Sequence, residues 1–94
     1  MKKRLIVVGD GPGLCDRVKI FGAELTLVSK PGNFDHTLLA STNRTIISDF
    51  ENDTGLIPML EVLHRLEPFN GVISMTELAL LPAARISRAL GLGE

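Results

Sequence analysis

The chain has 94 residues, of which 45% are hydrophobic and 22% are charged, so we expect one globular domain rather than a disordered segment. Ten basic and eleven acidic residues give a net charge of −1, which provides no electrostatic case for a nucleic-acid or anionic-membrane partner. The single cysteine, Cys15, excludes an internal disulfide bond and favours a reducing, cytoplasmic location. The first apolar run, Leu5–Val8, is too short to cross a bilayer or to act as a secretion signal.

Short apolar runs along the chain predict β-strands. The runs are Leu5–Val8, Glu24–Val28, Thr45–Ile47 with Ser48, and Gly71–Ser74. The first and the last are continuous rather than alternating, which is typical of strands that are buried on both faces of a parallel sheet.

Helical segments separate the predicted strands. They are Gly11–Phe21, a short one at Phe34–Ser41, Asp53–Leu66 and Leu78–Leu90. Asp53 or Thr54 can cap the third helix, and Gly91 follows the last one, where glycine is favoured. The third helix is expected to bury one face, formed by Leu56, Met59, Leu60 and Leu63.

This alternation of strands and helices predicts an α/β fold with right-handed crossovers. We expect a Rossmann-like, three-layer half-fold. Its four-stranded parallel sheet would have the order 3-2-1-4, with helices on both faces.

The first strand runs into a loop that contains Gly9, Gly11 and Gly13. A glycine loop between a strand and a helix can bind phosphate, because backbone N–H groups approach an anion at the helix N-terminus. The dinucleotide fingerprint G-x-G-x-x-G is incomplete, because Leu14 stands at its third glycine position. Ser29 and Lys30 stand where the fingerprint has an acidic residue that binds the ribose. Three interpretations stay open: a tight turn that needs glycine, an anion contact on the substrate side, or an NAD(P) site.

Thr76 and Glu77 follow the fourth strand, at the edge of the sheet where open α/β folds bind ligands. The helix N-terminus also stabilises a carboxylate there, so Glu77 is either a helix-start acid or a ligand-facing group. Cys15, His36 and His64 have no spacing typical of metal ligands, and we expect no metal site. His64 is expected to be solvated on the flank of its helix.

The last predicted helix has more apolar surface than one sheet face requires. Its expected core stripe is Leu78, Pro82, Ile86, Ala89 and Leu90. Leu80, Leu81 and Ala84 lie outside that stripe. They are either ordinary surface residues or the contact for another domain or for a second copy of the chain.

Four segments follow one another along nearly the whole chain: LIVVGDGPG, GAELTLVSKPG, TIISDFEND and FNGVISMTELALLPAARISRALGLGE. In this order and spacing they resemble the N-terminal, or pre-ATP-grasp, domain of ATP-grasp carboxylate–amine ligases. The last segment is the most specific, with a strand, a Thr-Glu corner, LLPAA and an ALGL ending.

The resemblance implies that the chain is the first part of a larger enzyme. Residues 1–90 would form the pre-ATP-grasp domain, and residues 91–94 would begin a linker to ATP-grasp domains of the same polypeptide. In this family those further domains bind ATP and magnesium and activate a carboxylate as an acyl phosphate, which an amine then attacks. The chain itself would be truncated, would hold no cofactor, and would be inactive alone.

The resemblance also implies which residues face the substrate: Gly9, Gly11, Gly13, Thr76 and Glu77. None of them would be catalytic. Leu80, Leu81 and Ala84 would form an interface, either with the lid domain or in a homodimer. The alternative function is a stand-alone Rossmann-like module that binds a nucleotide or a dinucleotide.

Overall fold

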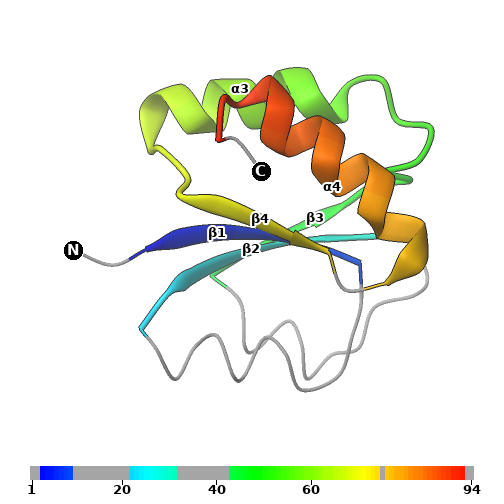
Figure 1. Cartoon of the computed structure of the whole chain (residues 1–94), viewed down its shortest axis with the longest axis horizontal. Helices are drawn as coiled ribbons and strands as arrows, with labels where there is room; N and C mark the ends of the chain where they lie inside the picture. Colours follow the sequence, from blue (N-terminus) through cyan, green and yellow to red (C-terminus); the bar gives the residue numbers. More distant parts are fainter. Residues whose placement is uncertain (1–2, 10–21, 32–42, 75, 93–94) are drawn as a thin grey trace.

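The structure is a computed structural model that describes residues 3–9, 22–31, 43–74 and 76–92 (Figure 1). Its strands are β1 (Arg4–Val8), β2 (Glu24–Ser29), β3 (Arg44–Ile47) and β4 (Gly71–Ser74). They form one parallel sheet in the order β3-β2-β1-β4. The predicted strand order and direction are confirmed, and each predicted strand end lies within one residue of the observed one.

Two described helices, α3 (Leu56–Leu66) and α4 (Glu77–Ala89), cover the same face of the sheet (Figure 1). α4 contacts β4 and β1 as well as α3. The segments predicted as helices for the other face, 11–21 and 34–41, lie outside the described residues. The α/β fold is therefore confirmed by the sheet and the helices of one face.

Both faces of the sheet are buried. Side chains alternate between the faces because the period of a strand is two residues. The strand residues that face α3 and α4 and are fully buried are Ile6, Val8 and Val28. On the opposite face the fully buried residues are Val7, Leu25 and Leu27. This double burial explains the continuous apolar run of β1. The run of β4 is also continuous, but β4 is an edge strand and is only partly buried, so the predicted burial on both faces is not observed there.

The predicted core stripe of α4 is partly wrong. Its buried residues are Ala79, Pro82, Ala83 and Ile86. Leu78 is 64% exposed and Ala89 is exposed as well. The small residue Ala79 faces the sheet because the first turn of α4 lies close to the end of β1, where a Cβ added at Gly9 would be 3.3 Å from the Ala79 Cβ. Gly91, with φ +70°, follows the end of the helix as predicted.

The predicted face of α3 needs one correction. Leu56 and Leu60 are buried and Leu63 packs against the core, as expected, but Met59 is 41% exposed. Ile57 packs against the core in its place. The buried stripe is thus rotated toward Ile57, away from the side that carries Met59.

Asp53 organises the turn before α3. Its Oδ2 accepts a hydrogen bond from the Ser48 hydroxyl at 2.7 Å, and its Oδ1 accepts one from the Gly55 N–H at 2.9 Å. The residue at the N-cap position is Gly55, so Asp53 acts from two residues before the cap. The bonds from Ser48 and then Gly55 favour the charged carboxylate and lower the pKa of Asp53 below its ordinary value of 3.8.

Asp53→Ala should destabilise the domain, because it removes both acceptors from the turn. We expect a fall of roughly a few degrees in Tm at neutral pH. A carboxylate with a lowered folded-state pKa stabilises the fold above its unfolded pKa, and this contribution is lost as the pH falls through the folded-state pKa. The Tm difference between wild type and variant, followed by circular dichroism, should therefore shrink below pH 3.8.

The matched control is Asp53→Asn, which retains an acceptor for the Gly55 N–H but cannot titrate. It should cost less stability than the alanine variant. A Tm difference for Asp53→Ala that stayed constant on acidification would contradict the role given to the ionised carboxylate.

Candidate functional site

The carboxyl ends of three neighbouring strands meet at one edge of the sheet. β1 runs into Gly9, β2 ends at Ser29, and β4 leads through Ser74 to Thr76 at the start of α4. Because the strands are parallel, these ends lie side by side. Ligands of open α/β sheets bind at this edge, so it is the candidate site.

Gly9 brings the first loop and the start of α4 together. Its φ is +92°, and its N–H donates to the Val28 carbonyl at 2.8 Å. A Cβ added at this position would lie 3.2 Å from Thr76 Oγ1 and 3.3 Å from Ala79 Cβ. Both the backbone angle and the close approach require glycine, which supports the tight-turn interpretation at Gly9. Gly11 and Gly13 lie outside the described residues.

Thr76 and Glu77 form the other side of this corner. Thr76 is the N-cap residue of α4 with an extended backbone (φ −140°, ψ 163°), but its side chain makes no capping hydrogen bond. Glu77 lies in the first turn, and both side chains are exposed. A free hydroxyl and a carboxylate side by side can accept hydrogen bonds from an amino group. The corner is thus chemically suited to a ligand that carries N–H donors.

Lys30, directly after β2, is engaged by its own neighbours. Its ammonium pairs with the Glu51 carboxylate and lies 3.8 Å from Asp49 Oδ1. It also lies 5.3 Å from the centre of the Phe50 ring. The hydrogen bond from Lys30 to Glu51, with the charge of both carboxylates, raises the pKa of the Lys30 ammonium above 10.5. The Lys30 ammonium is thus bound by two carboxylates of the chain, which does not favour a role for it in an NAD(P) site.

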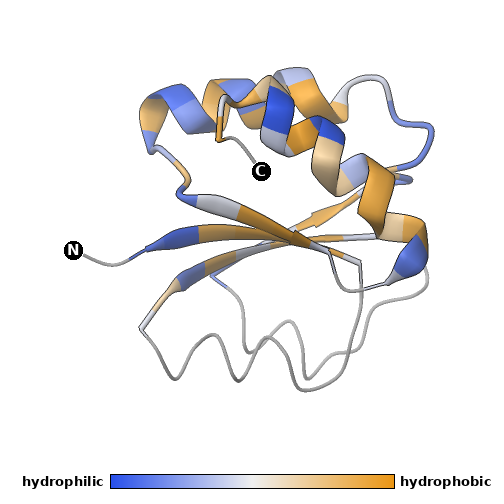
Figure 2. Ribbon diagram, viewed as in Figure 1, coloured by the Kyte–Doolittle hydropathy of each residue, from blue (hydrophilic) through white to orange (hydrophobic). Residues whose placement is uncertain are grey.

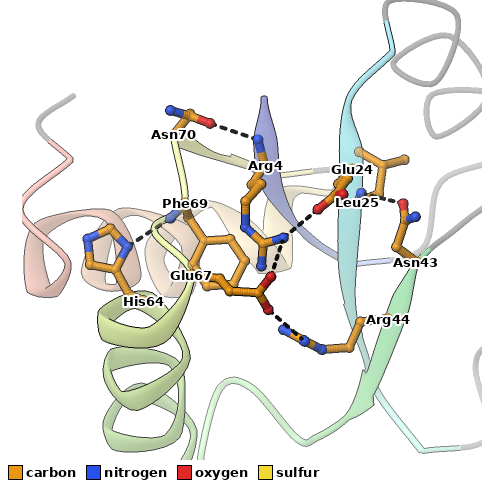
Figure 3. Close-up of polar contacts among 9 residues, drawn as sticks. All are labelled: Arg4, Glu24, Leu25, Asn43, Arg44, His64, Glu67, Phe69 and Asn70. Carbon is orange, nitrogen blue, oxygen red and sulfur yellow. Dashed lines mark hydrogen bonds and ion pairs between the residues drawn. The ribbon is translucent and has the colours of Figure 1, made fainter. Parts of the chain in front are cut away.

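A charged cluster at the opposite, amino edge of the sheet was not predicted from the sequence (Figure 3). Arg4 pairs with Glu24 and lies 3.5 Å from Glu67, which in turn lies 3.7 Å from Arg44. The Arg4 guanidinium also lies 5.3 Å from the centre of the Phe69 ring. The available signal was that charged residues of alternating sign begin β1, β2 and β3.

Two asparagines secure the same edge. The Oδ1 of Asn70 accepts from the Arg4 N–H at 2.8 Å, and the Asn70 N–H donates back to the Arg4 carbonyl at 2.7 Å. Asn43 binds both backbone groups of Leu25 in the same way, at 3.0 and 2.9 Å. Each asparagine immediately precedes a strand and sets its register against a neighbour.

The prediction that His64 is solvated is wrong, because its side chain packs at the amino edge of the sheet. It is half-buried, its Nδ1 accepts from the Phe69 N–H at 2.9 Å, and its ring stacks on Phe69 with 6.1 Å between the centroids. The charges of the amino edge are therefore paired within the fold, as in a structural cluster, although the buried Nε of Arg4 has no hydrogen-bond partner among the described residues.

A hollow of about 760 Å³ runs between α4 and β4, the edge strand of the sheet. The residues that line it are Val72, Ser74, Leu80, Ala83, Ala84, Ser87, Arg88 and Gly91. Leu80 and Leu81 are each 59% exposed, and Ala84 is exposed too. These three residues lie outside the core, as the sequence predicted; their role as an interface stays a prediction.

The described parts of the chain contain no group of three His, Cys, Asp or Glu residues that could hold a metal ion. In the same ranges, neither helix has the length and apolar character needed to cross a bilayer.

Comparison with known families identifies the class of protein. The family model of the ATP-grasp N-terminal domain matches residues 17–93. The chain belongs to this family. No curated protein matches the chain.

Two solved structures share the fold of the chain. The chain superposes on the L-amino acid ligase from Bacillus licheniformis with a TM-score of 0.81 at 20% identity, over 99% of this chain and 25% of that one. It superposes on phosphoribosylglycinamide synthetase from Anaerococcus prevotii with a TM-score of 0.69 at 18% identity, over 94% of this chain and 22% of that one. The chain thus spans about a quarter of the length of these proteins, and at such identities the likeness establishes the fold alone.

Gly9→Ala should destabilise the domain for two reasons, the positive φ and the crowding against Thr76 and Ala79. Gly22→Ala is the matched control, because Gly22 has φ +77° but an added Cβ would meet nothing within 4 Å. We expect about 1–2 kcal/mol for the control, from backbone strain. The loss for Gly9→Ala should be larger by about 1–3 kcal/mol, from crowding.

Urea unfolding of the wild type and both variants measures the two losses. Equal losses for Gly9→Ala and Gly22→Ala would contradict the close approach between the end of β1 and the start of α4.

Proposed function

We propose that the chain is the substrate-side N-terminal domain of an ATP-grasp ligase that joins a carboxylate, such as that of an amino acid, to an amine. The observation that carries the proposal is the family match over residues 17–93. The two structural neighbours described above are named as a ligase and a synthetase. In such an enzyme ATP would activate the carboxylate as an acyl phosphate before the amine attacks.

The corner at the carboxyl edge is the proposed substrate wall. Gly9 and Thr76 are in contact there, and Glu77 stands beside them with an exposed carboxylate. The Thr76 hydroxyl and the Glu77 carboxylate would bind the amino group of a substrate. Gly11 and Gly13 would continue this wall along the loop. No residue of the corner is given a catalytic role, because the reacting atoms would be held mainly by other domains.

ATP and magnesium are assigned to further domains of the same polypeptide. Residues 1–90 would form the present domain and residues 91–94 would begin the connection. At this point the Gly91 N–H donates to the Arg88 carbonyl at 3.1 Å and the Leu92 N–H donates to the Ser87 carbonyl at 2.9 Å. These two bonds, with Gly91 at φ +70°, close the end of α4. We place the enzyme in the cytoplasm, consistent with the single cysteine.

The 94-residue chain mixed with ATP, magnesium and amino acids should release no phosphate above the blank in a colorimetric assay. The reason is that the proposal assigns ATP and magnesium to other domains. Measurable turnover by the chain alone would contradict the proposed division of labour.

The substrate corner is tested by ¹⁵N NMR titration of the chain with a panel of free amino acids. Backbone signals of Gly9, Thr76 and Glu77 should shift, and those of Asn43 and Asn70 at the opposite edge should serve as internal controls. Glu77→Gln should weaken the response to the amino group and Leu78→Gln should not. Micromolar binding of NAD(H), NADP(H) or ATP, with no response to amino acids, would instead support the stand-alone nucleotide-binding module.

A further inference from the structure

One side of α4 carries a short, regular stripe of exposed residues. Glu77, Leu81, Ala84 and Arg88 follow one another at intervals of four, three and four residues, which places them on one side of a helix. All four are exposed. The opposite side of the helix faces the sheet with its buried residues, Ala79, Pro82, Ala83 and Ile86. Figure 2 shows that hydrophobic residues recur along the whole of α4.

The stripe is complementary to itself when two copies of α4 run antiparallel. If a two-fold axis passes midway between Leu81 and Ala84, Leu81 of each chain lies against Ala84 of the other. The same axis brings Glu77 of each chain to Arg88 of the other, because these residues are also equidistant from it. The contact is therefore isologous, with every interaction made twice.

The shapes of these residues suit such a contact. Leu81 is 59% exposed and projects from the stripe, whereas Ala84 leaves room for a large side chain opposite it. Beside Ala84 the stripe borders the hollow of about 760 Å³, whose walls include Leu80 and Arg88. A leucine from a second copy can be buried between these groups, as a knob enters a hole between helices.

The charges of Glu77 and Arg88 favour a second copy of the chain as the partner and an antiparallel orientation of the two α4 helices. Among the residues that the structure describes, neither Glu77 nor Arg88 has an ion-pair partner. An antiparallel pair of α4 helices gives each of them one of opposite sign, whereas a parallel pair would oppose like charges. We infer that this stripe is a homodimer interface, at which a second copy of the chain packs its α4 antiparallel. This inference does not rest on the proposed function, but it shares Glu77 with it, so the dimer and a bound amino group would compete for that carboxylate.

The mass of the wild-type chain should depend on concentration. Sedimentation equilibrium at micromolar to millimolar concentrations should show a rise from 10.2 kDa toward twice that mass. Leu81→Glu should abolish the rise, since it places two carboxylates near the two-fold axis. Leu78→Glu is the matched control, because Leu78 is 64% exposed on the same helix but lies off the stripe, and it should leave dimerisation unchanged.

A charge exchange tests the pairing itself. Glu77→Arg alone, or Arg88→Glu alone, should weaken dimerisation by on the order of tenfold, because two attractive pairs become repulsive. An equimolar mixture of the two variants should restore it, since both ion pairs are then rebuilt in the heterodimer. Circular dichroism of each variant establishes that it is folded, and restoration in the mixture cannot arise from a change in folding.

Three results would overturn the inference. The first is a wild-type chain that stays at 10.2 kDa at every concentration, as expected if another domain covers α4 instead. The second is a dimer that survives Leu81→Glu. The third is a mixture of the charge variants that associates no better than each variant alone.

Discussion

The close approach of α4 to the end of β1 is the constraint on which the rest of the structure depends. A Cβ added at Gly9 would be crowded, at 3.2 Å from Thr76 Oγ1 and 3.3 Å from Ala79 Cβ. With α4 in this position, Ala79, Pro82, Ala83 and Ile86 face the sheet, whereas Leu78, Leu80 and Leu81 are exposed. The same contact joins the two segments of the candidate site and produces the exposed stripe on the outer side of the helix.

The two edges of the sheet differ in how far their polar side chains are paired. At the amino edge, Arg4 and its carboxylate partners neutralise one another, and two asparagines hold the strand starts in register. At the carboxyl edge, Thr76 and Glu77 are exposed, and the Thr76 side chain makes no capping bond. A site needs polar groups whose bonding capacity is still available, and the described residues offer them at the carboxyl edge. Lys30, a described cation at that edge, is held by Glu51 and Asp49.

Much of this fold could be predicted from the sequence. Continuous apolar runs indicated buried parallel strands. The alternation of these strands with helices predicted an α/β fold, for which the strand order 3-2-1-4 was expected. The rotation of α4 could not be predicted, because a helical wheel weights Leu78 above Ala79, whereas the deciding factor is the space beside Gly9. The bonds of His64 and Asn70 were missed for a similar reason: their partners come from tertiary contacts that periodicity does not encode. The glycine pattern predicted a tight turn at Gly9, which its φ of +92° bears out. It could not show whether the loop binds a ligand.

The most direct test of the central claim is the size of the native gene product that carries this sequence. An antibody raised against the domain would be used on a lysate of the source cells, with the purified 94-residue chain as the size standard. The account predicts a band several times larger than 10.2 kDa, since the domain spans about a quarter of the ligases that share its fold. A single band at 10.2 kDa would contradict the assignment to a larger ligase and would favour a free-standing binding domain.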